Sequence, residues 1–215
     1  MNAAECSKKK ESCSHAFGKA LESSFYERDT RVVAVELIGK VLVFRNREGL
    51  LAGRIVETEA YLGGDDPASH AYRGVTPRNR VMFGPPGMSY VYFTYGNHHC
   101  FNVVTEPDGK AGAVLIRALE PLEGIEVMKR RRSAEDISNL TSGPGKLTQA
   151  FGLAREHSGL DLTQINFHVE DNSSEPGDSI AASPRIGITH AREKMYRYFV
   201  ASSPFVSVRG KHALR

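Results

Sequence analysis

Short runs rich in apolar residues, some alternating with polar positions and some continuously apolar, recur along the chain and predict β-strands. The runs KVLVF and LLAGRIVETEAY, on either side of the turn RNREG, predict an antiparallel pair over residues 40–44 and 50–61. SYVYFTYG and HHCFNVVTE, joined at Gly96-Asn97, predict a hairpin over residues 89–106, and GAVLIRALEP predicts a further strand over residues 112–121. The last third of the chain predicts short strands at residues 165–169, 183–189, 196–200 and 205–208.

A helical period is confined to a few segments. Asp29 or Thr30 can cap a helix that ends at Gly39, with apolar residues three and four positions apart between them. Residues 62–88 are rich in Gly, Pro, Asp and Arg and predict a long loop, which inside a domain is usually functional. No repeat or interdomain linker interrupts the pattern, so the sequence predicts one α+β domain. Two further helices are predicted, PLEGIEVMKRRRSAED and SGPGKLTQAFGL, over residues 121–136 and 142–153.

The N-terminal residues differ in character from the rest. Residues 1–24 are polar and contain no apolar core of the kind found in signal peptides. We therefore expect a flexible extension over residues 1–24, followed by the folded domain at residues 25–215. No apolar run reaches the roughly 20 residues of a membrane span.

The composition excludes little beyond membrane proteins and disulfide-rich scaffolds. The hydrophobic content of 40% and charged content of 25% are ordinary globular values. The net charge of +3 permits an anionic partner without requiring one. Cys6, Cys13 and Cys100 form no C-x-x-C pair, which predicts reduced thiols in an intracellular protein and no zinc cluster.

The stretch VETEAYLGG puts Glu57, Glu59 and Tyr61 on one face of a predicted strand. Like charges on one face repel each other, and carboxylates are poor strand formers. Carboxylates at this spacing could form the acid and base of a sugar hydrolase, although both would come from one rigid strand. For Glu57 we expect an ordinary role, either exposed or paired with Arg54 or Arg117. Glu59 directly precedes the long loop and is the better candidate for chemistry.

The long loop carries basic and hydroxyl-bearing side chains among glycines and prolines. Such a loop can bind phosphates through side chains and backbone N–H groups, and equally it can be a solvated arginine loop. His70 has no His or Cys partner at ligand spacing, and His98 and His99 would point to opposite strand faces, so no metal site is expected. The loop residues of interest are His70, Arg73, Thr76, Arg78, Asn79 and Arg80.

Aromatic residues gather in the predicted hairpin. Tyr90, Tyr92 and Phe93 lie within a strand, where aromatic side chains most often belong to the core. Tyr95 stands beside Gly96 at the predicted hairpin tip, where we expect it to be exposed. An exposed aromatic side chain on a stiff turn can act as a wedge between bases.

Taken together, these segments resemble the alkyladenine DNA glycosylase family, also called 3-methyladenine DNA glycosylase. The resemblance runs from about residue 25 to about residue 208, in similar order and spacing. It rests on RIVETEAYLG, a histidine nine residues after Tyr61, TPRNR, YVYFTYG, Asn102, LIRALEPLEG and SGPGKL. The implied fold is a single compact α+β domain with a curved antiparallel sheet, surrounding helices and a protruding β-hairpin.

The resemblance also implies an activity. Members of the family flip alkylated or otherwise damaged purines out of duplex DNA and hydrolyse the N-glycosidic bond, which leaves an abasic site. By that resemblance Glu59 would be the general base that activates a water, and Arg117 would position both. The enzyme would be a monofunctional DNA N-glycosylase that needs no cofactor.

The pocket and the DNA contacts follow from the same resemblance. Tyr61, His70 and Tyr92 would stack on the flipped base, because electron-rich rings favour cationic purines. Asn102 would crowd the exocyclic amine of normal guanine, and Tyr95 would fill the space that the extruded base leaves. Contacts with the DNA backbone are expected from Thr76, Arg78, Arg80 and Lys146.

The expected partner is double-stranded DNA containing damaged purines, bound by a monomer without a membrane. The protein would work in the cytoplasm at the nucleoid if bacterial, and in the nucleus if eukaryotic. Two other functions stay open at this stage. A non-catalytic DNA-damage recognition module would not need Glu59 with Arg117, and a nucleoside hydrolase would not need an exposed wedge or the TPRNR loop.

Overall fold

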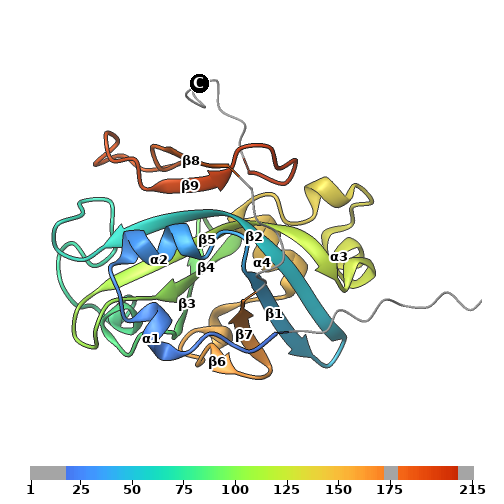
Figure 1. Ribbon diagram of the computed structural model, residues 1–215, viewed down its shortest axis with the longest axis horizontal. Helices are drawn as coiled ribbons and strands as arrows, with labels where there is room; N and C mark the ends of the chain where they lie inside the picture. Colours follow the sequence, from blue (N-terminus) through green and yellow to red (C-terminus); the bar gives the residue numbers. More distant parts are fainter. Residues whose placement is uncertain (1–17, 172–178, 208–215) are drawn as a thin grey trace, which may run out of the picture.

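The computed structural model describes residues 18–171 and 179–207. Within these ranges nine strands form one strongly curled antiparallel sheet, seen in Figure 1. The strands are β1 (Val41–Asn46), β2 (Gly49–Leu62), β3 (Ser89–Thr94), β4 (His98–Val104), β5 (Gly112–Glu123), β6 (Thr163–Gln164), β7 (Phe167–Glu170), β8 (Ile180–Ser183) and β9 (Arg197–Val200). The order across the sheet is β3-β4-β5-β2-β1-β7-β6, with β9 paired to β2 and β8 paired to β9.

The helices of the described ranges are few and short. They are α1 (Ser23–Tyr26), α2 (Thr30–Glu36), α3 (Ile125–Arg132) and α4 (Pro144–Phe151), with 3-10 turns η1 (Arg80–Phe83), η2 (Ile137–Asn139) and η3 (Arg155–His157). None of them is long and apolar enough to cross a membrane. The sheet with these helices makes one compact α+β domain, as predicted.

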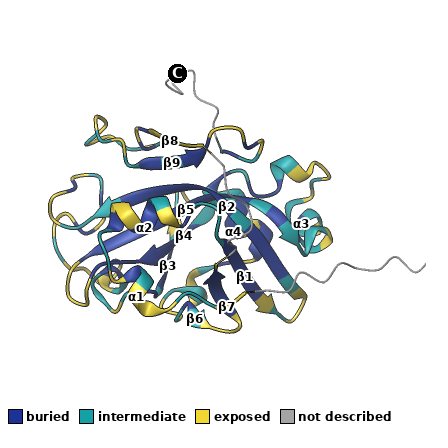
Figure 2. Cartoon of the chain, viewed as in Figure 1, coloured by how far each residue is buried: buried dark blue, intermediate teal, exposed yellow. Residues whose placement is uncertain are grey.

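The core lies along the two long central strands, β2 and β5. Their residues are mostly buried, and α2 turns a buried side toward the sheet and an exposed side outward (Figure 2). Asp29 caps α2 by accepting a hydrogen bond from the Arg31 N–H at 2.8 Å. Val33 and Leu37, four positions apart, are fully buried as their spacing predicts, and Ala34 is buried beside them. Burial of this apolar surface is the main stabilising term for the fold.

The central strands were predicted well because their patterns are local. The pair β1 and β2, the hairpin of β3 and β4, and strand β5 all lie where the sequence predicts them. Strand β4 pairs with β5 only over Asn102–Val104, at the end farthest from the hairpin tip. The N-cap of α2 at Asp29 and the start of α4 at Pro144 also agree with the prediction, whereas α2 ends at Glu36, before the predicted end at Gly39.

The predicted helix over residues 121–136 begins too early. Residues up to Glu123 belong to β5, because Pro121 and Glu123 pair with Gly53 and Ala52 on β2. The helix starts only after Gly124, whose positive φ of 76° turns the chain out of the sheet. A Cβ at Gly124 would lie 2.4 Å from Leu51 Cδ2, so this turn requires glycine.

Two of the predicted C-terminal strands are wrong. Residues 183–189 form a loop apart from Ser183, the last residue of β8, which the sequence did not predict. Residues 205–207 form no strand, and residue 208 lies outside the described part. Backbone N–H groups of both segments donate hydrogen bonds to side chains instead of to a neighbouring strand. Ile186 N–H donates to Glu59 and Ser207 N–H donates to Glu57.

The first 17 residues of the predicted extension, including Cys6 and Cys13, lie outside the described residues. From residue 18 onward the chain is packed on the sheet, and Leu21 N–H donates to Val169 O at 2.8 Å. Cys100 is a buried free thiol.

Candidate active site

A cavity of about 270 Å³ opens between the sheet and two loops, residues 62–88 and residues 184–190. This volume is close to the lower end of the roughly 300–1,000 Å³ of small-molecule sites, which suits a single flat ring. Its wall brings together Tyr61, His70, Tyr92, Tyr95, Asn102 and Arg117, six of the residues singled out in the sequence.

Glu59 lies behind this wall without any exposed surface. Its Oε1 accepts a hydrogen bond from Ile186 N–H at 2.7 Å. Its Oε2 accepts from the Tyr61 hydroxyl at 2.8 Å and from Arg117 Nη1 at 3.2 Å. All three donors belong to residues of the cavity wall, so the carboxylate lies directly beneath the cavity. Burial raises the pKa of Glu59, and the positive charge of Arg117 opposes that rise without cancelling it.

Glu57 is also fully buried, so the expectation that it is exposed is wrong. The alternative, an ion pair with Arg117, is confirmed at 3.0 Å, while Arg54 pairs with Glu120 instead. Glu57 Oε1 also accepts from Arg197 Nε at 2.7 Å. Burial favours a protonated Glu57, but the two guanidinium groups outweigh it and lower the pKa of this carboxyl.

Arg117 links the two acids. Its Nε donates to Glu57 and its Nη1 donates to Glu59, while Nη2 contacts Ser207 Oγ at 3.3 Å. Burial alone would lower the pKa of Arg117. The two carboxylates outweigh burial and raise this pKa above its ordinary value, so the guanidinium stays charged. Glu57 thus fixes the orientation in which Arg117 reaches Glu59.

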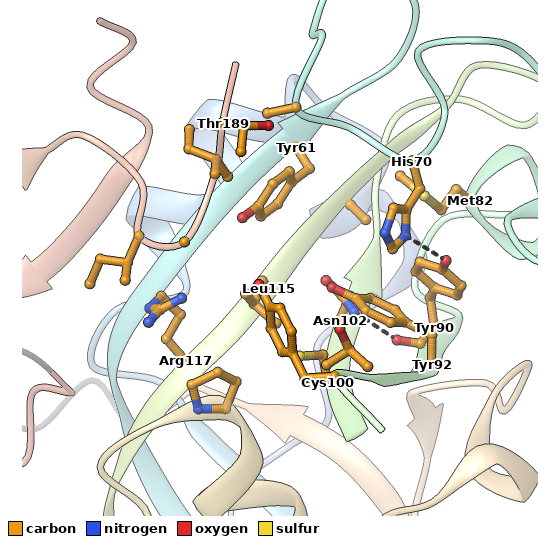
Figure 3. A pocket seen from close by; sticks show the side chains of 18 of the residues that line it. Tyr61, His70, Met82, Tyr90, Tyr92, Cys100, Asn102, Leu115, Arg117 and Thr189 are labelled. Carbon is orange, nitrogen blue, oxygen red and sulfur yellow. Dashed lines mark hydrogen bonds between the residues drawn. The ribbon is translucent and has the colours of Figure 1, made fainter. Parts of the chain in front are cut away.

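Aromatic rings stand on opposite sides of the cavity. Figure 3 shows Tyr61 on one side, and His70 and Tyr92 on the other. The rings of His70 and Tyr92 are 4.6 Å apart at their centroids, and His70 Nδ1 is 3.0 Å from the Tyr90 hydroxyl. Desolvation and the charge of Arg78 lower the pKa of His70, which keeps the imidazole neutral at neutral pH. A flat ligand between these walls would contact ring faces on both sides.

Asn102 lies in the wall next to Tyr92, where its amide is held in one orientation. Its Nδ2 donates to Tyr90 O at 2.9 Å, and the side chain is buried (Figure 3). Tyr90 is in the core as predicted, whereas the prediction of a core position for Phe93 is wrong, because Phe93 is 50% exposed.

Tyr95 stands at the hairpin tip with 77% of its surface exposed, which confirms the sequence prediction. Its φ of +50° is unusual for a residue with a side chain, and Gly96 beside it has φ +72°. A large apolar side chain held outward in a strained backbone conformation is expected where function requires it.

The four residues expected to contact DNA backbone have different surroundings. Thr76, Arg78 and Arg80 are exposed on the long loop. Arg78 lies over the Tyr92 ring at 5.3 Å and donates to Phe93 O at 3.3 Å. Lys146 already donates to Asn139 Oδ1. Asn79, another residue of this loop, is buried and hydrogen-bonds to the loop itself.

Sequence reasoning missed Asp66, Arg185, Ile186 and Arg197, which contact the site from the long loop, the loop after β8, and β9. Arg197 contacts Glu57 and Ile186 contacts Glu59, although the residues of each pair are more than 100 positions apart in the sequence. For Arg185 and Ile186 the signal in the sequence is the run SPRIGIT, an arginine amid apolar residues, whose composition favours a strand.

The curled antiparallel sheet and its aromatic-walled cavity over a buried carboxylate–arginine pair define the structural class of this protein. Comparison with known families then gives the family. The family model described as methylpurine-DNA glycosylase matches residues 24–204, and the chain belongs to this family.

Similar proteins cover most of the chain. One from Prosthecochloris aestuarii is 49% identical over 184 residues, 85% of this chain and 88% of the relative. One from Chlorobaculum tepidum is 50% identical over 190 residues, 88% of this chain and 91% of the relative. One from Methanoculleus marisnigri is 49% identical over 192 residues, 88% of this chain and 99% of the relative. Each is named "Putative 3-methyladenine DNA glycosylase".

Proposed function

We propose that this protein is a 3-methyladenine DNA glycosylase that hydrolyses the N-glycosidic bond of damaged purines in duplex DNA. One observation carries the proposal: the buried Glu59 carboxylate, hydrogen-bonded to Arg117, lies beneath a cavity of the size of one base. Family membership and the names of the relatives support the same substrate.

In this proposal Glu59 is the general base. It accepts the proton of a water that attacks C1′ of the sugar, and the electron pair of the broken bond leaves with the base. The raised pKa of Glu59 makes its ionised form a stronger base, and Arg117 keeps the carboxylate in place. Within the described residues the cavity wall contains no lysine, which supports water as nucleophile and a monofunctional enzyme.

The wall residues account for selection of the base. A damaged purine flipped out of the helix would stack between Tyr61 and the rings of His70 and Tyr92, and a neutral His70 does not repel a cationic purine. The Asn102 amide, fixed by Tyr90 O, cannot turn away from the exocyclic amine of normal guanine. Exclusion of the normal base would then supply selectivity.

Tyr95 completes the proposal on the DNA side. Its exposed ring at the hairpin tip would enter the space that the flipped nucleotide vacates, while Thr76, Arg78, Arg80 and Lys146 approach the backbone. A protruding hairpin would serve this entry. We propose that a monomer acts in the cytoplasm on the chromosome, since the relatives come from bacteria and archaea.

The first test removes the base without removing its shape. Glu59→Gln should abolish release of the damaged base from lesion-bearing duplex oligonucleotides, which alkali treatment reveals as strand scission at abasic sites. Binding of the same duplex should stay largely intact. Glu120→Gln, a glutamate on β5 paired with Arg54 away from the cavity wall, is the matched control and should leave base release unchanged.

The same assay separates the alternatives. Base release retained by Glu59→Gln would overturn the assignment of Glu59. Lesion binding by the wild-type protein without scission would indicate a recognition module. Hydrolysis of free nucleosides but not of duplexes would indicate a nucleoside hydrolase.

A further inference from the structure

Arg185 and Asp66 form an ion pair behind the cavity, and neither side chain has exposed surface. Two parallel contacts of 2.5 and 2.7 Å join the guanidinium and the carboxylate. Arg185 Nη1 also donates to Ala60 O at 2.8 Å. Asp66 accepts from the N–H groups of Leu62 and Ala68, at 3.1 and 3.3 Å. The pair therefore connects the end of β2 and the long loop to the loop that follows β8.

Folding stability alone is a poor reason for this arrangement. Removing two charges from water costs free energy that their attraction often fails to recover, so apolar replacements are frequently neutral or stabilising. Arg185 Nε, moreover, is buried without a hydrogen-bond partner among the described residues. A buried ion pair in which one donor lacks a hydrogen-bond partner suggests that the pair serves to hold neighbouring groups in position.

The Arg185 guanidinium also covers part of the proposed stacking wall. Its Cζ lies over the Tyr61 ring at 4.6 Å from the centroid and over the Tyr196 ring at 5.3 Å. Arg185 does not line the cavity, whereas Tyr61 does. The guanidinium thus supports the Tyr61 ring from outside the cavity, and a ring held in this way is pre-organised for stacking.

The backbone next to Arg185 acts on the proposed base. Ile186 N–H donates to Glu59 Oε1 at 2.7 Å, and the Tyr61 hydroxyl donates to Glu59 Oε2 at 2.8 Å. Fixing Arg185 therefore fixes a donor to each carboxylate oxygen, one through the adjacent peptide and one through the supported ring.

We propose that Arg185, held by Asp66, is a positioning residue that sets the place of both the Tyr61 ring and the Glu59 carboxylate. This inference rests on the proposed function. It gives the loop after β8, residues 184–190, a role in base release. This role is separate from DNA contact and from nucleophilic attack.

The test uses Asp66→Asn combined with Arg185→Met, which removes both charges and leaves neither one buried alone. We expect release of the damaged base, measured in a single turnover with saturating enzyme, to slow by about 10–100-fold, as misplacement by about 1 Å can cause. Arg54→Met, which removes an ion-paired arginine from β2 outside the cavity wall, is the control and should keep the wild-type rate.

The pH profile provides a readout that a purely structural role would not change. The Ile186 N–H favours an ionised Glu59, so its displacement should raise the pKa of Glu59 and move the acid limb of base release to higher pH. The titratable groups that face Glu59 are Arg117, Tyr61, Glu57, Cys100 and Arg185, and the double variant removes the charge of Arg185 together with that of its partner Asp66.

Each outcome decides the matter. A folded double variant with the wild-type rate and acid limb would refute the positioning role. If the double variant does not fold, Arg185→Lys provides the same two readouts, because lysine keeps the charge but cannot make the paired contact. Absence of base release by the wild-type protein itself would instead refute the proposed function.

Discussion

Glu57 and Glu59 are two positions apart on one strand, yet their surroundings move their pKa values in opposite directions. Glu57 shares two guanidinium groups and both Ser207 donors, which together outweigh its burial. Glu59 contacts the guanidinium group of Arg117, and the effect of burial outweighs it, so the pKa of Glu59 is raised. Environments that separate two neighbouring carboxyl groups in this way are typical of sites where one acid works and the other supports it.

Tyr95 allows a prediction at the same scale. In a Glu59→Gln background, Tyr95→Ala should weaken binding of lesion-bearing duplex by about 10–100-fold, because the loss of aromatic stacking costs roughly 1–3 kcal/mol per base. A 2-aminopurine placed beside the lesion reports flipping by its fluorescence, and this signal should fall as well.

Phe93 is the matched control for Tyr95. It is an exposed aromatic residue of the same hairpin with its ring packed on His99, so Phe93→Ala should bind nearly as the parent does. Equal loss in both variants would show that Tyr95 has no special part as a wedge.

The long loop is ordered by hydrogen bonds from one buried side chain, although it contains little regular structure. Asn79 Nδ2 donates to His70 O at 2.8 Å and to Gly74 O at 2.9 Å, while its Oδ1 accepts from Thr76 N–H at 2.6 Å. These bonds close the segment between His70 and η1. The loop that carries one wall of the cavity therefore depends on an amide that does not itself line the cavity.

Asn79→Ala should loosen this loop. The variant removes three hydrogen bonds to partly buried backbone groups, and we expect a loss of about 1–3 kcal/mol in the free energy of unfolding, measured with urea. Limited proteolysis should cut faster within residues 62–88, and lesion binding should weaken because His70 and Arg78 lose their places. Asn46→Ala, at the turn between β1 and β2, should show neither effect; equal proteolysis of both variants would contradict this account.

On the scale of the whole molecule, charge is buried in two separate parts of the sheet, on the central strands β2 and β5 and on β7. Near the cavity the buried acids have arginine partners, whereas on β7, beyond β1, Glu170 lies beside His168 with few partners. Glu170 Oε2 and His168 Nδ1 have no hydrogen-bond partner among the described residues. Burial raises the pKa of Glu170 from its ordinary value of 4.5 to about 7.

This raised pKa predicts how stability depends on pH. The native protein holds the Glu170 proton more tightly than the unfolded chain does, so the contribution of Glu170 is present below about pH 4.5 and is lost as pH rises through about 7. Glu170→Gln should therefore raise the free energy of unfolding at pH 8 by about 1–3 kcal/mol, with little change at pH 4.5. Urea unfolding at both pH values measures this, with Glu120→Gln as the control. The same gain at both pH values would exclude titration of Glu170 as the cause.

The sequence by itself was sufficient for elements whose signals are local. Alternating or short apolar runs predicted β1 to β5, and capping or turn residues predicted the starts of α2 and α4. The motifs around Glu59, Tyr61 and Tyr95 identified the family, which the family model confirms. The cavity wall does bring together the six predicted residues on and near β2 to β5.

Only the tertiary structure decided which charges meet. Glu57 was expected at the surface or in a pair, and the fold buries it between Arg117 and Arg197, which lie 60 and 140 positions away. Residues 183–189 have the composition of a strand but follow a loop, because Arg185 and Ile186 bind Asp66 and Glu59 instead of a neighbouring strand. Hydrophobic periodicity and secondary-structure propensity describe only the local conformation of a segment. Burial of a charge depends on partners brought in by distant segments, and these partners are fixed only when the sheet closes.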